Sequence, residues 1–261
     1  MNWLNKKWII TLAAVIPFGA VDAQKRLTLE DPTGKVEVCI TLDDVIKYSV
    51  SHEGDVMIAP SPISMELMDG AVLGKSPRLK KQSRSSENSV ITPPLYKRKT
   101  IKDHYNELVL HFKGNYSLVF RAYEDGVAYR FLTNSKDSLF IKNEQAVFNL
   151  PDNPKIFAAT PKGRTIDGEE NQYHSSFQNT YQHVNLSEWD KNRLAFMPVL
   201  AERRGEKKVC ITEADLLNYP GMFLKVSPDD KGFYGHFAAY PKDVSVEVRG
   251  LKGVVKTREP Y

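Results

Sequence analysis

Short runs in which hydrophobic and polar residues alternate follow one another along most of this chain of 261 residues. In the run 35–42, apolar side chains occupy every second position from Val36 to Leu42, which places them on one face of a β-strand. The dipeptides Gly114-Asn115 and Asp125-Gly126 lie between such runs and predict β-hairpins. The pattern predicts strands over residues 35–42, 46–50, 56–59, 63–67, 108–112, 117–123, 127–132, 146–150, 194–201, 207–212, 222–226, 233–239, 245–248 and 254–256.

Many short strands at close spacing, with turn residues between them, favour an all-β sandwich or barrel. After residue 23, no segment shows the apolar periodicity of an amphipathic helix of three turns. The stretch 151–191 is different because it is polar and lacks apolar periodicity, which predicts a long functional loop. Its aromatic residues favour an ordered loop, and they are Phe157, Tyr173, Phe177, Tyr181 and Trp189.

The first 23 residues have the features of a secretory signal peptide. Lys6 and Lys7 precede a short apolar run over residues 8–18, and small residues follow up to Ala23. We expect cleavage after Ala23 and export to the periplasm. An uncleaved anchor is the alternative, but the run is short for a membrane span.

Charge and cysteine content narrow the classes of function. The formal net charge of +4 falls to +3 without residues 1–23, which is too small to indicate binding to nucleic acid or, once the signal is removed, to a membrane. A basic cluster at 75–84 predicts a solvated loop or an edge strand. We expect Cys39 and Cys210 to be buried free thiols, and no Cys/His spacing indicates zinc.

An ordered set of segments resembles glycoside hydrolase family 97, which contains exported bacterial α-glucosidases and α-galactosidases. The order and spacing of these segments match that family from about residue 27 to the end of the chain. The segments are Asp31-Pro32-Thr33-Gly34 with the run to Val38, residues 46–50, Asp103-His104-Tyr105-Asn106-Glu107-Leu108, and residues 120–131, 186–188 and 211–222.

The resemblance implies that residues 24–261 form the N-terminal domain of such an enzyme, a large β-sandwich related to galactose-mutarotase-like sandwiches. In the family a (β/α)₈ barrel follows this domain and carries the catalytic carboxylates. We therefore expect this chain to contain no catalytic residue and to need a barrel in cis or encoded downstream. The implied substrate is an α-linked oligosaccharide, and the domain would support the barrel and contribute a loop to the active site.

The resemblance also implies a calcium ion near the loop 167–179. The candidate ligands are Glu170, Gln172 and His174, and Gln178 stands where related sequences tend to carry Glu. Calcium prefers several charged oxygen ligands, whereas an amide and an imidazole are weak ones, so we expect little or no calcium binding by this chain alone. The alternative for Glu170 and its neighbour Glu169 is a solvated acidic turn.

Two further sets of side chains could contact a sugar. Tyr173 and Trp189 are the best candidates for stacking on a sugar ring, with packing beneath the loop as the alternative. Glu213 and Asp215 could hold a sugar or a cation, or could accept backbone N–H bonds in a turn.

Two other functions stay open from the sequence. The chain could be a free-standing carbohydrate-binding β-sandwich without hydrolase activity. It could also be a fragment that needs the barrel to stay soluble.

Overall fold

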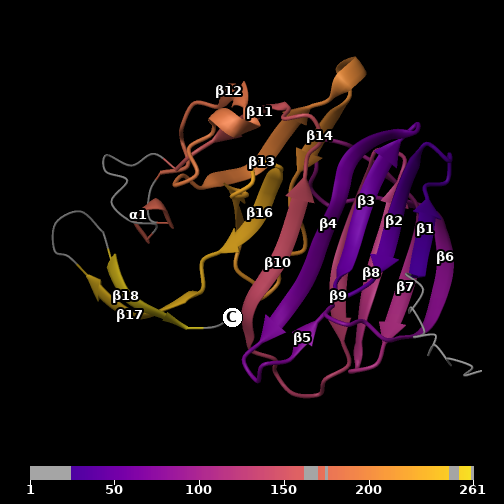
Figure 1. Ribbon diagram of the computed structural model, residues 1–261, viewed down its shortest axis with the longest axis horizontal. Helices are drawn as coiled ribbons and strands as arrows, with labels where there is room; N and C mark the ends of the chain where they lie inside the picture. The colour runs from indigo at the N-terminus through magenta and orange to yellow at the C-terminus, as the bar shows by residue number, and fades with distance from the viewer. Residues whose placement is uncertain (1–24, 162–169, 174–175, 247–252, 260–261) are drawn as a thin grey trace, which may run out of the picture.

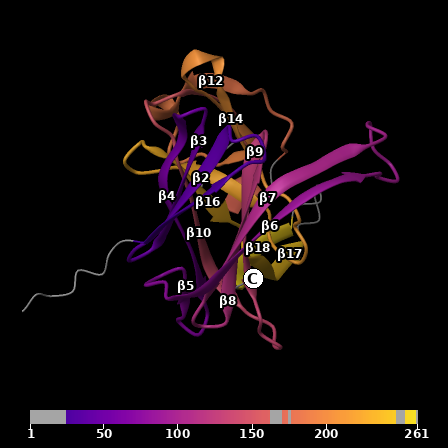
Figure 2. The same ribbon diagram turned by 90° about the vertical axis from the view of Figure 1, so that its right-hand side faces the viewer.

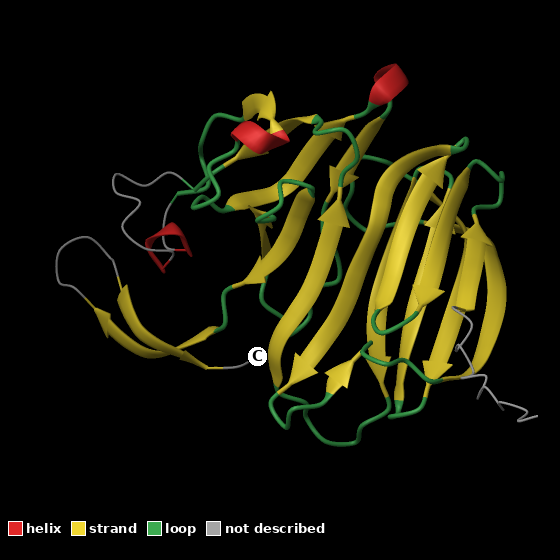
Figure 3. Ribbon diagram, in the orientation of Figure 1, coloured by secondary structure: helices red, strands yellow, loops and turns green. Residues whose placement is uncertain are grey.

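The computed structural model describes residues 25–161, 170–173, 176–246 and 253–259, so the predicted signal peptide lies outside it. Strands dominate this part of the chain (Figure 3). Its helices are short pieces, namely α1 (Glu170–Tyr173) and the 3-10 turns η1 (Leu186–Glu188) and η2 (Arg204–Glu206). None of the described helices has the length and apolar character needed to cross a membrane. The predicted all-β class is confirmed.

A large antiparallel sheet runs through the whole molecule (Figure 1). Its strand order is β1-β2-β3-β4-β10-β16-β15-β13-β11-β12, with β5 paired to β4 and β14 paired to β13. Strand β10 therefore joins two halves, one built from the N-terminal strands and one from the C-terminal strands. The strands are β1 (Lys25–Glu30), β2 (Val36–Leu42), β3 (Ile46–His52), β4 (Asp55–Leu67), β5 (Val72–Leu73), β10 (Ile141–Asn149), β11 (Lys155–Ala159), β12 (Gln182–Asn185), β13 (Ala195–Glu202), β14 (Lys208–Ile211), β15 (Met222–Val226) and β16 (Gly232–Phe237).

A second sheet of four strands contacts the N-terminal half of the large sheet. Its strands follow chain order and are β6 (Leu79–Ile91), β7 (Ile101–Phe112), β8 (Tyr116–Tyr123) and β9 (Gly126–Thr133). The two predicted hairpins are confirmed, since Gly114-Asn115 connects β7 to β8 and Asp125-Gly126 connects β8 to β9. A separate hairpin consists of β17 (Tyr240–Val246) and β18 (Gly253–Glu259).

The core fills the space between the two sheets, as the alternating pattern requires. Tyr48 on β3 shows the arrangement, because its ring centroid lies 6.2 Å from that of Phe120 on β8 and 5.5 Å from that of Tyr129 on β9. Its hydroxyl donates a 3.1 Å hydrogen bond to the carbonyl of Val147 on β10. Tyr48 therefore connects both sheets to the central strand, and it is buried while its polar atom is satisfied.

Several predictions need correction. Residues 56–59 and 63–67 were predicted as two strands but belong to the single strand β4, although Pro60 and Pro62 lack N–H groups. The hydroxyl of Ser61 accepts the N–H of Asn149 and donates to the carbonyl of Ala59, which replaces regular pairing there. Strand β1 was not predicted, and the stretch 151–191 contains β11, α1 and β12 in place of one irregular loop.

The basic cluster and the cysteines have mixed outcomes. Residues 79–84 of the cluster lie in β6, an edge strand, which confirms one of the two predicted alternatives. Both cysteines are free, and Cys39 is buried as expected. Cys210 is exposed, which corrects the prediction, because its strand β14 pairs only with β13 among the described strands.

Candidate functional site

The segment around α1 is fastened to the C-terminal half of the large sheet by the buried side chain of Gln172. Its amide nitrogen donates a 2.9 Å hydrogen bond to the carbonyl of Asn192, and its amide oxygen accepts a 2.8 Å bond from the N–H of Leu194. Asn179 fixes the far end of the same loop by donating to the carbonyl of Thr160 at 3.0 Å. These bonds fix Gln172 and Asn179 relative to the sheet.

Tyr173 turns from the end of α1 toward the sheet. Its hydroxyl and Nε2 of His236 on β16 are hydrogen-bonded at 2.5 Å, and the planes of the two rings are nearly parallel, at 5°. The Tyr173 ring centroid also lies 5.4 Å from that of Phe223 on β15. Tyr173 is therefore packed against the sheet and partly buried, which leaves part of the side chain accessible.

Aromatic side chains from the loop and from three adjacent strands form one cluster, which we call the aromatic patch. Phe196, Phe223 and His236 occupy directly opposed positions on β13, β15 and β16, so their side chains share one face of the sheet. Phe177 and Tyr181 from the loop pack edge-on against Phe196, with centroids 5.6 and 6.0 Å away, and remain 48% and 43% exposed. The patch consists of Tyr173, Phe177, Tyr181, Phe196, Phe223 and His236.

The loop members of this patch could be named from the sequence, since Tyr173, Phe177 and Tyr181 are among the aromatic residues of the polar stretch. Phe196, Phe223 and His236 had no predicted role, because each lies in a strand where an aromatic residue is expected in any case. The only signal in the sequence was that each occupies a position alternating with buried residues such as Ala195 and Leu224.

Trp189 lies apart from the accessible part of the loop. The side chain is 4% exposed and belongs to the hydrophobic core, and its indole nitrogen donates to the carbonyl of Arg193 at 3.4 Å. This position fits the alternative of packing beneath the loop, because no ring face is open for a sugar.

The three candidate calcium ligands do not form a site in the described residues. Gln172 does not fit a ligand role, since its only oxygen already accepts the N–H of Leu194 and the side chain is buried. His174 lies outside the described residues, and for Glu170 only the backbone is described. Within the described ranges no group of three or more His, Cys, Asp or Glu side chains could hold a metal.

The acidic pair Glu213 and Asp215 has a structural role. Glu213 accepts the N–H of Met222 at 2.9 Å, and Asp215 forms an exposed ion pair with Arg130 at 3.2 Å. The first contact confirms the expected backbone interaction. The two side chains have different partners, so they do not form a shared binding site.

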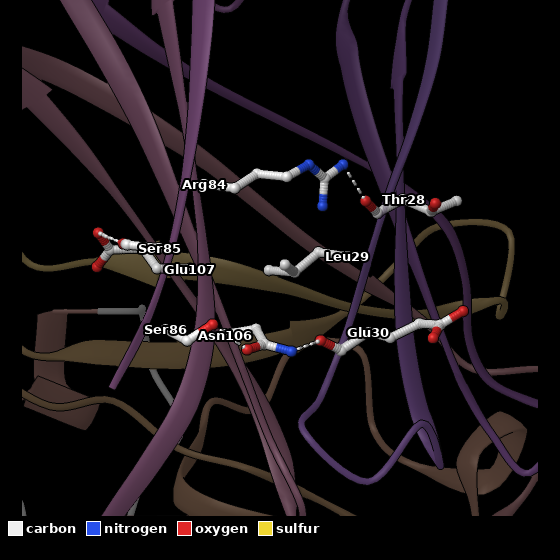
Figure 4. Close-up of a pocket in the computed structure, with 8 residues that line it drawn as sticks. All are labelled: Thr28, Leu29, Glu30, Arg84, Ser85, Ser86, Asn106 and Glu107. Carbon is white, nitrogen blue, oxygen red and sulfur yellow. Dashed lines mark hydrogen bonds between the residues drawn. The ribbon is translucent and has the colours of Figure 1, made fainter. Parts of the chain in front are cut away.

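A polar groove of about 530 Å³ lies between the edges of the two sheets (Figure 4), and its residues are distant in sequence from those of the aromatic patch. Arg84 of β6 donates to the carbonyl of Thr28 at 2.6 Å, and Asn106 of β7 donates to the carbonyl of Glu30 at 2.9 Å. These side chains reach across to the free edge of β1 and satisfy its backbone. These hydrogen bonds connect the two sheets at this edge of the sandwich. The residues that line the groove are Thr28, Leu29, Glu30, Arg84, Ser85, Ser86, Asn106 and Glu107.

Comparison with known proteins identifies the family. The family described as Glycosyl-hydrolase 97 N-terminal matches residues 29–249. The chain belongs to this family. A relative named as a retaining alpha-galactosidase from Bacteroides thetaiotaomicron is 37% identical over 259 residues, which cover 98% of this chain and 39% of the relative. This family 97 N-terminal domain thus spans well under half the length of that relative.

Solved structures support the same fold. A family 97 enzyme from Pseudoalteromonas sp. strain K8, in complex with acarbose, superposes with a TM-score of 0.68 and 20% identity over 90% of this chain and 34% of that chain. A beta-arabinopyranosidase gives a TM-score of 0.67 with 21% identity over 80% of this chain and 35% of that chain. Both confirm that the predicted sandwich is the fold of this family 97 domain.

Proposed function

We propose that this family 97 domain is the accessory part of an exported glycosidase that acts on α-galactosides or α-glucosides. It would support a catalytic (β/α)₈ barrel and add the loop 167–179 to the active site, without being catalytic alone. The aromatic patch carries this proposal, because it combines partly exposed rings with a loop fastened by Gln172, and apolar surfaces of this kind mark interfaces or binding sites.

The name of the Bacteroides relative supports an α-galactoside as the first substrate to test. The direct experiment replaces the N-terminal part of that relative by this chain and measures kcat/KM with an aryl α-galactoside. We expect an active chimera, no turnover by this chain alone, and a loss of about tenfold or more when Phe177 and Tyr181 are both changed to Ser. A folded but inactive chimera, or turnover by the purified chain alone, would overturn the proposal.

A free-standing carbohydrate-binding domain is the second candidate. Phe177 and Tyr181 favour it, since both rings are about half exposed and a sugar ring can stack on such a face. Calorimetry of the chain with α-linked galacto- and gluco-oligosaccharides distinguishes the two functions. Binding by the isolated chain that is lost in the same double variant supports this candidate, whereas an accessory domain binds sugar only next to its barrel.

Two further features belong to this proposal. The chain is exported to the periplasm and cleaved after Ala23, which the intact mass of the periplasmic product tests.

Calcium belongs to the complete active site, so calorimetry of the isolated chain should show binding weaker than about millimolar, the weak end of protein calcium sites. Tighter binding that Glu170→Gln abolishes would assign the ligand role to Glu170.

A further inference from the structure

Strands β6 and β7 form a long hairpin that extends beyond the body of the protein (Figure 2). The two strands pair from Leu79 opposite Phe112 to Ile91 opposite Ile101, whereas β8 pairs with β7 only from Tyr105 onward. Arg84 and Asn106 hold the base of the hairpin against β1 (Figure 4). The outer part therefore has two strands and no third layer, and we call residues 90–102 the tip.

The tip exposes a group of large apolar side chains. Val90 and Ile91 at the end of β6 are 63% and 47% exposed, and Leu95 and Tyr96 in the connecting turn are 94% and 58% exposed. A two-stranded hairpin has no opposite layer to cover them. Single exposed apolar residues are common on protein surfaces, whereas a cluster of them on a projecting element indicates a binding surface.

The hairpin and the segment that leads into β6 carry a strong local excess of positive charge, a net +8 from nine basic residues and one acid. Residues 75–102 contain nine basic residues and the single acid Glu87, whereas the whole chain has a net charge of +4. All nine are exposed, and within the described residues no ion pair joins them to an acidic side chain. They are Lys75, Arg78, Lys80, Lys81, Arg84, Lys97, Arg98, Lys99 and Lys102.

We propose that the tip of the β6–β7 hairpin binds the surface of a bilayer that contains anionic lipid. Leu95 and Tyr96 would enter the boundary between headgroups and acyl chains, where leucine and tyrosine are well accommodated. Lys97, Arg98 and Lys99 follow at once and would contact lipid phosphates. This surface is separate from the aromatic patch and does not depend on the function proposed for it.

The chemistry favours lipid over a protein partner. A protein would need a pocket shaped for four apolar side chains inside an acidic rim, whereas an anionic bilayer supplies both properties over any area. The net charge alone predicted no membrane contact. The structure changes that expectation because it places Lys97, Arg98, Lys99 and Lys102 together with four exposed apolar side chains at one projecting tip, whereas residues 79–84 lie at the base of the same hairpin.

The test measures sedimentation with vesicles of phosphatidylcholine, alone or mixed with phosphatidylglycerol in equal parts. The chain is prepared with and without residues 1–23, so that binding by the apolar run 8–18 is not attributed to the hairpin. We expect binding to the mixed vesicles that salt weakens and that falls about tenfold or more in Leu95→Ser/Tyr96→Ser and in Lys97→Glu/Lys99→Glu.

The matched control Lys113→Glu/Lys136→Glu makes the same charge change at exposed turn positions outside the tip and should leave binding within about twofold of the unchanged chain. Near-ultraviolet circular dichroism verifies that every variant is folded. Equal binding by tip variants and the unchanged chain would overturn the proposal. A second result would also overturn it, namely no binding to vesicles together with a protein contact that requires Leu95 and Tyr96. That contact could be self-association or binding to the remaining part of the Bacteroides relative, and in either case the tip would contact protein.

Discussion

The hydroxyl of Tyr219 donates a 2.6 Å hydrogen bond to Oε2 of Glu144, which ties the segment before β15 to the central strand β10. Burial raises the pKa of Glu144, the Tyr219 hydrogen bond lowers it, and the charge of nearby Glu213 raises it, with a net increase. Burial also raises the pKa of Glu213, against the lowering effect of the Met222 N–H. The carboxyl groups of Glu144 and Glu213 therefore hold protons more strongly than in the unfolded chain.

This pair predicts a specific dependence of stability on pH. A carboxyl whose pKa is higher in the folded state contributes stability below its unfolded pKa, near 4.5, and the contribution is lost as pH rises through the folded pKa. Glu144→Gln keeps an oxygen for Tyr219 and removes the titration. Urea unfolding measures the unfolding free energy of the variant minus that of the unchanged chain. This difference should be larger at pH 7 than at pH 4. The exposed control Glu124→Gln should show no such change, and an equal response of both variants would contradict the prediction.

Asp31 predicts the opposite dependence. Burial raises its pKa, but hydrogen bonds from the Thr33 hydroxyl and from the N–H groups of Val36, Thr33 and Lys35 outweigh burial and lower it. Its contribution is therefore present above the unfolded pKa of 3.8 and is lost as pH falls through the folded pKa. Asp31→Ala should cost about 2–3 kcal/mol of unfolding free energy at pH 7.

The matched control for Asp31 is Asp69→Ala, since Asp69 accepts one exposed N–H, that of Ala71. Urea unfolding should give less than about 1 kcal/mol for this control. The cost of Asp31→Ala should also shrink in acid, and a cost that does not depend on pH would show that the carboxylate charge is not the source.

Adding one methyl group at Gly232 should strongly lower the stability of the fold. A Cβ at this position would lie 2.0 Å from the carbonyl oxygen of Phe148 and 2.7 Å from Cα of Asn149, so two backbones would have to separate where β16 meets β10. Gly232→Ala should lower the unfolding free energy by about 3 kcal/mol, the upper end for overpacking. Gly126→Ala is the control, because nothing lies within 4 Å of its Cβ position. Thermal unfolding of both variants measures the difference, and similar values would refute the steric argument.

We expect the side chain of Gln172 to hold α1 in place next to the aromatic patch. Gln172→Ala leaves the buried N–H of Leu194 without its acceptor, which should cost about 2 kcal/mol. Hydrogen exchange should accelerate at Leu194 and in α1. The exposed neighbour Gln178→Ala should leave exchange at Leu194 unchanged. Retained protection of Leu194 in the Gln172 variant would mean that other contacts hold the loop.

The elements that could be predicted from sequence are those with a strong local signal. Residues 222–226 were predicted as a strand and form β15 with the same bounds, because alternation and flanking turn residues agree there. Strand β6 was largely missed, since a hairpin with exposed faces needs no apolar pattern. Strand β4 was divided in two because proline normally excludes a central strand, and only the distant Asn149 shows how Ser61 compensates.

The candidate site was harder to predict because its residues meet only through long-range pairing. Tyr173 and His236 are 63 positions apart, and nothing local to either residue indicates the contact. Burial was equally hidden, since Gln172 and Trp189 occur in a polar stretch and yet are 4% exposed. The family resemblance indicated the segment 167–179 as a candidate, whereas the partner of each described side chain needed the three-dimensional structure.

The position of β10 has a consequence for the order of assembly during synthesis. All strands of the N-terminal half and of the four-stranded sheet precede residue 134, and most pair with a neighbour in sequence. Pairing of Val147 with Tyr234 has to wait until the ribosome has made the 87 residues that separate them, about 4–17 seconds at ordinary elongation rates. The N-terminal half can therefore be folded while the nascent chain still lacks β16, and the aromatic patch is completed last, on a template that already exists.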